Sequence, residues 1–406
     1  MMPLSRDTPL VVLGDDWGRH VSTLQHLFRR VVDRHPVIWV NSYGHRIPQL
    51  TLYDVRRAVE KVAAMVRPRT RPVDGTGPFP AAIVEPRALP WHHRRVIHAL
   101  NTASLRRDIL RTLARVAPGR RPVFITGTPV AEGLVGRLGE LASFYFIIDD
   151  YAELPYVTPQ LVTPHETQML SKVDAVVATA AALVERKRPA SGRAHHVPQG
   201  VNYEHFAQPR PVPAELEALP RPILGFAGGV SECLDVEQVR NLAQDYPSAS
   251  VVLVGPISID VASLALPNVH LLGPRPYADL PAYVQAFDVG LIPYVLNDWT
   301  RSVDPLKLLE YLAAGLPVVS TPLPEAGKYG DVVHIATAGP AFRNGVQHAL
   351  TQRDAASRAT FQSVARANTW EARAQAVLDV IAEVVASRQA YEASATPRTG
   401  SRAMAR

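Results

Sequence analysis

The chain has 406 residues, of which 47% are hydrophobic and 20% charged, a composition typical of globular proteins and a length too great for one ordinary core. Its single cysteine, Cys233, excludes an internal disulfide framework and any cysteine-rich metal site. Residues 1–200 hold 27 Lys and Arg against 17 Asp and Glu, a net charge of +10, whereas residues 201–406 hold 16 against 20, a net charge of −4. We therefore expect one domain to face something anionic, such as nucleic acid, a membrane surface or a phosphorylated substrate.

The first half of the chain alternates between apolar strands and helical segments. A continuous apolar run such as "LVVLG" is typical of a strand that is buried on both faces of a parallel sheet. The predicted strands are 10–14, 36–41, 81–86, 122–127, 143–149 and 174–180, with helices predicted at 20–34 and 105–116. This alternation predicts a doubly wound α/β domain over residues 1–200.

The pattern is interrupted at 195–222, where proline becomes frequent, and then starts again. Strands are predicted at 223–229, 250–256, 269–273, 288–294 and 317–321, with helices at 236–246, 278–287 and 304–315. We expect a second Rossmann-like domain over 201–368, facing the first across a cleft. A long amphipathic helix at 369–390 should cross back to the first domain, and the small, polar residues 391–406 read as a disordered tail.

The segment "SVDPLKLLEYLAAGLPVVSTPLPE" (302–325) predicts an otherwise apolar helix that carries one basic and one acidic residue a turn apart. Asp304 suits the N-cap and Pro305 the first helical position, which places Lys307 beside the positive end of the helix dipole. A diphosphate is favoured there, and Glu310, one turn on, can accept hydrogen bonds from the two hydroxyls of a ribose. The alternative is a solvated Lys–Glu pair worth only about 0.2–0.5 kcal/mol. Asp304 stays open between a cap and a contact.

Several stretches together resemble glycosyltransferases with the GT-B fold, and most closely the bacterial branch that builds exopolysaccharide, teichuronic-acid-like or lipid-linked glycans. They are "GFAGGV", "VVLVGP", "NVHLLGPRPYADLPAYVQAFDVGLIPY", "VPQGVNYEHF" and "PLKLLEYLAAGLPVV", with a looser match at "DDWGRHVSTLQHL". The resemblance implies two Rossmann-like domains facing each other across a cleft. Carried over to matching positions, it places the ribose at Glu310 and the diphosphate at Lys307 and the helix start at Pro305.

The same resemblance implies further donor contacts. Gly228 and Gly229 would lie against the phosphates or the donor sugar, because glycine lets a backbone approach closely. Arg275 and Tyr277 would border the nucleobase. The chain also departs from the retaining branch of this family: Ser302 stands where a first glutamate is common, and no basic residue follows the glycine turn before Arg240. Phosphate charge would then be neutralised by Lys307, the helix end and Arg301, and the stereochemical outcome stays open.

Candidate acceptor-side residues come from the first domain. Asp15 follows the first strand in "GDDWG", where the glycine spacing does not match a dinucleotide-binding fingerprint. Asp149 and Asp150 end the fifth strand, at the sheet edge where α/β folds bind ligands, and either can deprotonate an acceptor hydroxyl in an inverting reaction. The alternative for each aspartate is a loop or helix cap. His20 and His45 are predicted to be ordinary rather than catalytic.

A basic segment spans residues 87–121, with nine Arg and one acidic residue, Asp108. Trp91 and alternating Leu and Ile suit a segment that lies on anionic lipid, where each Arg contributes about 1 kcal/mol. A solvated basic helix packed on the sheet is the equal alternative. Few aromatic residues accompany these arginines, so we do not expect nucleic acid as a partner.

The sequence therefore predicts a metal-independent hexosyltransferase-type glycosyltransferase. It would use a nucleoside diphosphate sugar as donor and a glycan or polyprenyl-linked molecule as acceptor, with no cofactor. Two alternatives are a nucleotide-sugar epimerase of the same fold and a non-catalytic sugar-nucleotide-binding subunit. No signal peptide and no run of about 20 apolar residues is visible, so we expect a cytoplasmic protein, with attachment to the inner face of the cell membrane as a further possibility.

Overall fold

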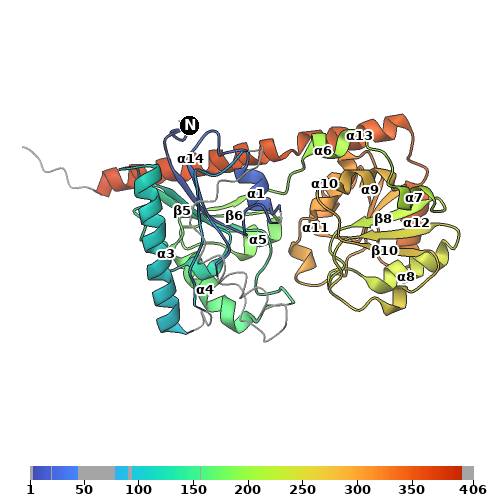
Figure 1. Cartoon of the computed structure of the whole chain (residues 1–406), viewed down its shortest axis with the longest axis horizontal. Coiled ribbons are helices and arrows are strands. Elements are labelled where there is room, and N and C mark those ends of the chain that lie inside the picture. Colours follow the sequence, from blue (N-terminus) through green and yellow to red (C-terminus); the bar gives the residue numbers. More distant parts are fainter. Residues whose placement is uncertain (1–2, 20, 44–77, 90–93, 156, 396–406) are drawn as a thin grey trace, which may run out of the picture.

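The computed structural model describes residues 3–19, 21–43, 78–89, 94–155 and 157–395. His20, His45 and Trp91 lie outside this part of the chain. The described residues form two parallel β-sheets, each flanked by helices (Figure 1). None of the described helices is both long enough and apolar enough to span a bilayer.

The first sheet has the strand order β3-β2-β1-β4-β5-β6-β7, and all neighbouring strands are parallel. Its strands are β1 (Leu10–Leu13), β2 (Val37–Val40), β3 (Ala82–Val84), β4 (Val123–Thr126), β5 (Ala142–Ile147), β6 (Ala175–Ala178) and β7 (Ala194–His196). Its helices are α1 (Thr23–Phe28), α3 (Arg95–Val116), the 3-10 turn η1 (Pro129–Ala131), α4 (Pro159–Lys172) and α5 (Ala181–Arg186). One face of the sheet packs on α1, and the opposite face packs on α3 and α4. The helix predicted over 20–34 is shorter than expected, because the α-helix ends at Phe28 and a series of turns follows.

The second sheet has the order β10-β9-β8-β11-β12-β13, again parallel. Its strands are β8 (Ile223–Ala227), β9 (Ser250–Val254), β10 (Val269–Gly273), β11 (Val289–Ile292), β12 (Val318–Ser320) and β13 (Val333–Ile335). The helical elements are α6 (Tyr203–Ala207), α7 (Ala214–Glu217), α8 (Val236–Asp245), η2 (Ala262–Leu264), α9 (Leu280–Ala286), η3 (Thr300–Ser302), α10 (Leu306–Ala313), α11 (Pro324–Gly327), α12 (Pro340–Ala349) and α13 (Ala355–Ala367). In both sheets the strand order reverses next to the first strand, and α/β folds bind ligands at such a point.

The last helix, α14 (Trp370–Ala395), runs from the second domain back over the first (Figure 1). Its apolar residues, among them Val377 and Ile381, join the core that α1 forms with the first sheet. At its start, the Trp370 ring stacks on His26 with centroids 4.8 Å apart and planes at 5°. The predicted tail began too early, since residues 391–395 continue this helix; 396–406 lie outside the described residues.

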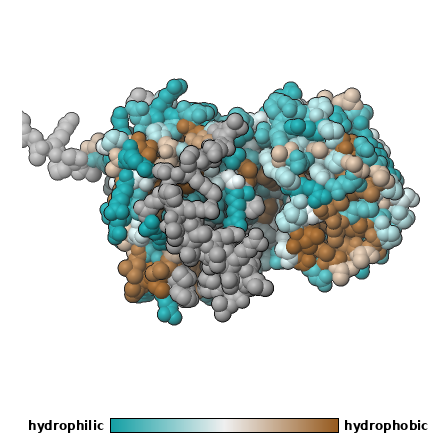
Figure 2. Space-filling view, in the orientation of Figure 1, coloured by the Kyte–Doolittle hydropathy of each residue, from teal (hydrophilic) through white to brown (hydrophobic). Residues whose placement is uncertain are grey.

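The predicted fold class is confirmed, since both halves are parallel α/β domains. Strands β7 and β13 were not predicted. Both are three-residue edge strands that are only partly buried, so neither shows the continuous apolar run that identified the others. In the space-filling view the two domains appear as separate lobes with a recess between them, and hydrophobic residues (brown) gather on the lower part of the second lobe (Figure 2).

Candidate functional site

Helix α10 places Lys307 at the carboxyl edge of the second sheet. Its apolar face, which includes Leu308 and Leu312, is buried in the core, and this burial fixes the helix against the strands. The Lys307 ammonium donates a hydrogen bond to the hydroxyl of Tyr294, just beyond β11, and lies 5.0 Å from the ring centroid of Phe226 in β8. Burial lowers the pKa of Lys307, because an ammonium loses hydration in this setting. The half-buried ammonium therefore lies at the edge of the sheet, against a hydroxyl group and two aromatic rings.

Gly228, directly after β8, gives Lys307 its space. The backbone of Gly228 has φ +155°, and a Cβ atom built there would lie 2.7 Å from Lys307 Cε. The Tyr311 hydroxyl accepts a hydrogen bond of 2.7 Å from the Ala227 N–H and so fixes the strand end before this turn. A Cβ on Gly229 would meet no atom within 4 Å. The turn thus packs against the Lys307 side chain at Gly228 and borders open space at Gly229.

Glu310 lies one turn after Lys307 and is 8% exposed. Burial raises the pKa of its carboxyl group to about 7, although the charge of Lys307 acts to lower it. No described residue donates a hydrogen bond to this carboxylate. A buried carboxyl group without a donor is costly for the fold, and in a cleft such a group is a candidate for ligand binding.

An aromatic group adjoins Glu310. Tyr277 stacks on His205 with centroids 4.8 Å apart and lies 5.6 Å from the ring of His26 in the first domain. Burial raises the pKa of the Tyr277 phenol, and the charge of Glu310 raises it further, which shows that the two groups are close. Planar side chains from both domains therefore meet beside the free carboxyl group.

Asp149 approaches the same place from the first domain. It follows β5, and its carboxylate accepts a hydrogen bond of 3.3 Å from the Trp299 indole across the domain boundary. Burial raises the pKa of Asp149, and the neighbouring charge of Asp150 adds to this. Burial also raises the pKa of Tyr294, and Asp149 contributes, so this carboxyl group lies near the hydroxyl that binds Lys307. The structure thus brings Asp149, Lys307 and Glu310 to one region.

Comparison with known proteins identifies the second domain. The family model for glycosyl transferases group 1 matches residues 221–352, which include β8, the glycine turn, Lys307 and Glu310. Residues 221–352 are thus similar to the glycosyl transferases group 1 family. The putative teichuronic acid biosynthesis glycosyltransferase TuaH of Bacillus subtilis (strain 168) is 33% identical over 180 residues. That match covers 42% of this chain and 45% of the relative, so it spans less than half of each protein.

Solved structures share the fold of the whole chain. An Escherichia coli structure described as trehalose-6-phosphate bound with UDP-2-fluoro glucose has a TM-score of 0.63 at 14% identity, covering 93% of this chain and 99% of that one. The α,α-trehalose 6-phosphate synthase of Burkholderia multivorans gives 0.63 at 14% identity, covering 95% and 100%. A glycosyltransferase from Rickettsia africae gives 0.62 at 13% identity, covering 93% and 99%. The predicted GT-B glycosyltransferase resemblance is confirmed.

Other predicted site residues have contacts elsewhere in the structure. Asp150 pairs with Lys187 at 2.7 Å and with Arg186 at 3.4 Å, so its carboxylate is occupied by structural ion pairs. Arg275 is bound by Glu215 at 2.9 Å and donates to the Tyr283 hydroxyl and the Leu272 carbonyl. These contacts give both side chains structural partners, and the predicted roles of Asp150 as a base and of Arg275 at the nucleobase stay predictions.

Three polar residues lie at the margin of the site. Arg301 is exposed on η3 and its nearest described partner is Asp298, at 3.8 Å, so nothing joins it to the Lys307 group. Asp15 lies exposed after β1, where its backbone carbonyl accepts a hydrogen bond from the Trp39 indole. Ser302, which stands where a first glutamate is common, donates to the Trp299 carbonyl at 2.8 Å and closes the η3 turn.

The helix start also differs from the prediction. Pro305 is the N-cap residue and Leu306 the first helical residue, one position later than expected. Asp304 does not cap the helix: its carboxylate accepts a 2.7 Å hydrogen bond from the Gln199 N–H in the interdomain segment. Burial raises the pKa of Asp304 to about 7. The prediction missed this link because the partner lies 105 residues away in the sequence.

The prediction also missed the aromatic frame of the site. Tyr294, Phe226 and Tyr311 surround the ammonium or fix the glycine turn, and Trp299 binds Asp149. A tyrosine directly after a buried strand, as in "LIPY", was the only available signal, since it places a hydroxyl at the carboxyl edge of the sheet.

Proposed function

We propose that the protein transfers a sugar from a nucleoside diphosphate sugar to a glycan or lipid-linked acceptor, in the synthesis of a cell-surface polysaccharide or glycoconjugate. The observation that carries this is the buried Lys307–Glu310 pair beside Gly228 in a glycosyl transferases group 1 domain. The relative TuaH supports the product class through its name, and the structural neighbour bound with UDP-2-fluoro glucose supports the donor class.

In this proposal the diphosphate lies between Lys307 and the turn at Gly228. The ammonium supplies a full positive charge, and the first N–H groups of α10 add the partial charge of the helix terminus. Both charges interact more strongly with an anion where water is excluded than in bulk water. Both would stabilise the negative charge that develops on the departing diphosphate. Because these groups already supply the charge, we expect transfer to need neither a metal ion at the donor site nor a cofactor.

Glu310 would bind the ribose of the donor. Its carboxylate can accept hydrogen bonds from two neighbouring hydroxyl groups, each worth about 1.5–3 kcal/mol for a charged acceptor. The aromatic ring of Tyr277, adjacent to this carboxyl group, offers a face for the nucleobase. These two residues then orient the nucleoside, while Lys307 holds the diphosphate.

Asp149 would serve the acceptor. Its carboxyl group comes from the opposite domain, and burial raises its pKa, which makes it a stronger base than an ordinary aspartate. A base is required if the configuration at the anomeric carbon inverts. The anomeric configuration of the product distinguishes inversion from retention. Anomeric analysis by proton NMR should show inversion under this proposal, and retention would remove the role of Asp149 as a base.

The transfer assay separates this function from its rivals. Full-length protein would be incubated with radiolabelled UDP-sugars, with and without a polyprenyl-phosphate-linked glycan, and the Glu310→Ala variant would be compared. A transferase consumes donor in proportion to the acceptor added, and the Glu310→Ala variant should lose this consumption. Consumption of donor without acceptor would indicate an epimerase, and binding of UDP without any consumption would indicate a non-catalytic subunit.

We further propose that the first domain docks on an anionic membrane surface through α3. Leu105, Ile109 and Leu113 bury one face of the helix against the sheet. The opposite face is exposed, and Arg106, Arg107 and Arg111 line a shallow hollow of about 900 Å³ with Arg137. Near the amino end of the helix, Val96 and Leu100 are 72% and 56% exposed. Exposed cations beside exposed apolar side chains suit anionic lipid.

Vesicle flotation tests this docking separately from catalysis. Protein should float with vesicles of phosphatidylglycerol and phosphatidylcholine but not with phosphatidylcholine alone, and Arg106→Glu with Arg107→Glu and Arg111→Glu should remove binding. Arg343→Glu with Arg240→Glu and Arg358→Glu, on the second domain, makes the same change of net charge and is the matched control. Binding that is unchanged by the α3 substitutions would contradict the assignment of this surface.

A further inference from the structure

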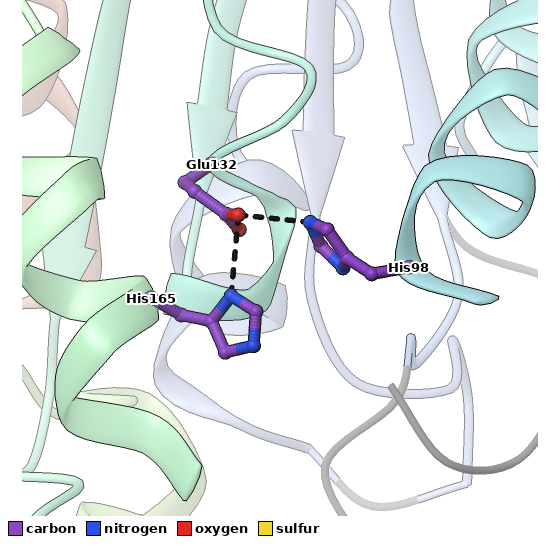
Figure 3. A group of neighbouring side chains, drawn as sticks. All are labelled: His98, Glu132 and His165. Atoms are coloured by element: carbon purple, nitrogen blue, oxygen red, sulfur yellow. Dashed lines mark ion pairs between the residues drawn. The ribbon is translucent and has the colours of Figure 1, made fainter. Parts of the chain in front are cut away.

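Three metal-binding side chains converge in the first domain, away from the residues assigned to the donor. His98 comes from α3, Glu132 directly follows η1, and His165 comes from α4 (Figure 3). Their potential ligand atoms all lie within 4.8 Å of one another, and this is the only such group among the described residues. Figure 3 shows the two rings pointing at the carboxylate from opposite helices.

The geometry is that of two nitrogen ligands and one carboxylate. His98 Nε2 lies 2.8 Å from Glu132 Oε1, and His165 Nδ1 lies 3.1 Å from the same oxygen. The ring centroids are 4.8 Å apart. With bonds of about 2.0–2.1 Å, neighbouring ligands of a tetrahedral zinc ion are roughly 3.3 Å apart. Shifts of a few tenths of an ångström would therefore admit an ion between these three atoms.

The carboxylate has unused binding capacity. Glu132 is 3% exposed, and its second oxygen, Oε2, has no hydrogen-bond partner among the described residues. An anionic oxygen that is enclosed and unbonded costs free energy, which a cation would offset by binding it.

An ion also has a path to this group. The side chains of His98 and His165 are 15% and 14% exposed, whereas that of Glu132 is 4% exposed. The imidazoles thus form the outer rim and the carboxylate the floor. Two imidazoles and one carboxylate are ligands that zinc takes in proteins, with water in the fourth position.

We propose that His98, Glu132 and His165 bind one divalent transition-metal ion, with zinc as the best match. The ion would link three elements that no strand pairing connects: α3, α4 and the segment that follows η1. All three ligands belong to the first domain, whereas Lys307 and Glu310 belong to the second. The proposed ion is therefore held by residues of the acceptor-side domain alone and by none of the residues assigned to the diphosphate.

Metal titration of the full-length chain, expressed without a polyhistidine tag, tests this proposal. After chelator treatment, zinc added in a calorimeter should bind at one equivalent, and cobalt should give the visible absorption of a tetrahedral site. His98→Ala, His165→Ala and Glu132→Gln should each weaken zinc binding by more than about 100-fold, beyond the loss that an outer-shell partner causes. Zinc should also raise the melting temperature of the wild-type chain but not that of these three variants.

A second histidine pair supplies the control. His334 and His348 have ring centroids 4.9 Å apart, but no described carboxylate completes a metal-binding group with them. His348→Ala should therefore bind zinc like the wild type. Circular dichroism and UDP binding, which depends on the other domain, establish that each variant is folded. Absence of stoichiometric zinc binding, or binding equal in Glu132→Gln and wild type, would overturn the proposal.

Discussion

Each domain buries a lysine together with acidic groups, but the two sites differ in how the charges are satisfied. In the first domain, Lys187 lies 2.7 Å from both Asp150 and Glu166. Burial acts to lower its pKa, yet these two bonds raise the pKa above the ordinary value. In the second domain burial lowers the pKa of Lys307, and Glu310 has no hydrogen-bond donor among the described residues.

This difference separates a structural role from a binding role. A buried ion pair with every charge compensated holds elements together, and removal of one partner is strongly destabilising. A buried charge without full compensation reduces stability and persists where a ligand supplies the missing partner. Asp149 and Asp150 repeat the contrast in adjacent positions, since Asp150 is paired twice while Asp149 accepts one bond from Trp299.

The largest effect is expected from Asp149→Asn. Loss of a general base reduces turnover by about 10²- to 10⁴-fold, while UDP-sugar affinity should change little because the residue lies on the acceptor side. Steady-state transfer kinetics and calorimetric donor binding measure the two quantities. Equal losses in both would place Asp149 in donor binding instead, and unchanged turnover would remove it from the site.

Lys187→Met should act on stability rather than on the chemistry. The substitution leaves Asp150 and Glu166 buried without their cation, at a cost of about 3–5 kcal/mol in the free energy of unfolding. Urea denaturation followed by circular dichroism measures this value. Arg186→Met, which removes only the longer and more exposed contact to Asp150, is the matched control and should cost far less. A loss below 1 kcal/mol would refute the structural role.

Lys307→Met should give the opposite result. Turnover should fall about 10²- to 10³-fold, the range for removing one preorganised group that stabilises developing charge. The free energy of unfolding should stay the same or rise, because burial penalises the ammonium. Arg301→Met, in the exposed turn beside the helix, should leave kcat within a few-fold of the wild type. If Lys307→Met destabilised the chain as Lys187→Met does, the contrast between the two lysines would disappear.

The smallest effect is a pH dependence of donor affinity. Glu310 must be ionised to accept hydrogen bonds from both ribose hydroxyl groups, and its pKa is raised from 4.5 to about 7. Donor affinity should therefore fall about tenfold per pH unit below 7 and level off above it, as expected for one competing proton. For the free protein the sign is reversed, since a raised carboxyl pKa favours folding at low pH and this contribution is lost as pH rises through 7. Glu310→Gln should abolish the slope in binding, and a slope that persists in this variant would assign it to another group.

The order of elements in the chain was enough to predict the fold. Continuous apolar runs bounded by turns identified most strands of both sheets, because burial on both faces leaves no polar position in such a strand. The short edge strands β7 and β13 escaped this reasoning, since an edge strand has neighbours on one side only. The spacing of Lys307 and Glu310 on one helix face was equally visible, because helical geometry is local.

Which charges are paired depended on contacts between distant segments. Adjacent aspartates after β5 are equivalent in the sequence, and Lys187, 37 residues further on, distinguishes them by binding only Asp150. Glu215 likewise binds Arg275, and Gln199 binds the Asp304 carboxylate that suited a helix cap. His98, Glu132 and His165 come together only because three helical segments pack on one sheet face. Local pattern specifies elements through backbone periodicity, whereas the free energy of a buried charge is set by whichever group the packed fold places beside it.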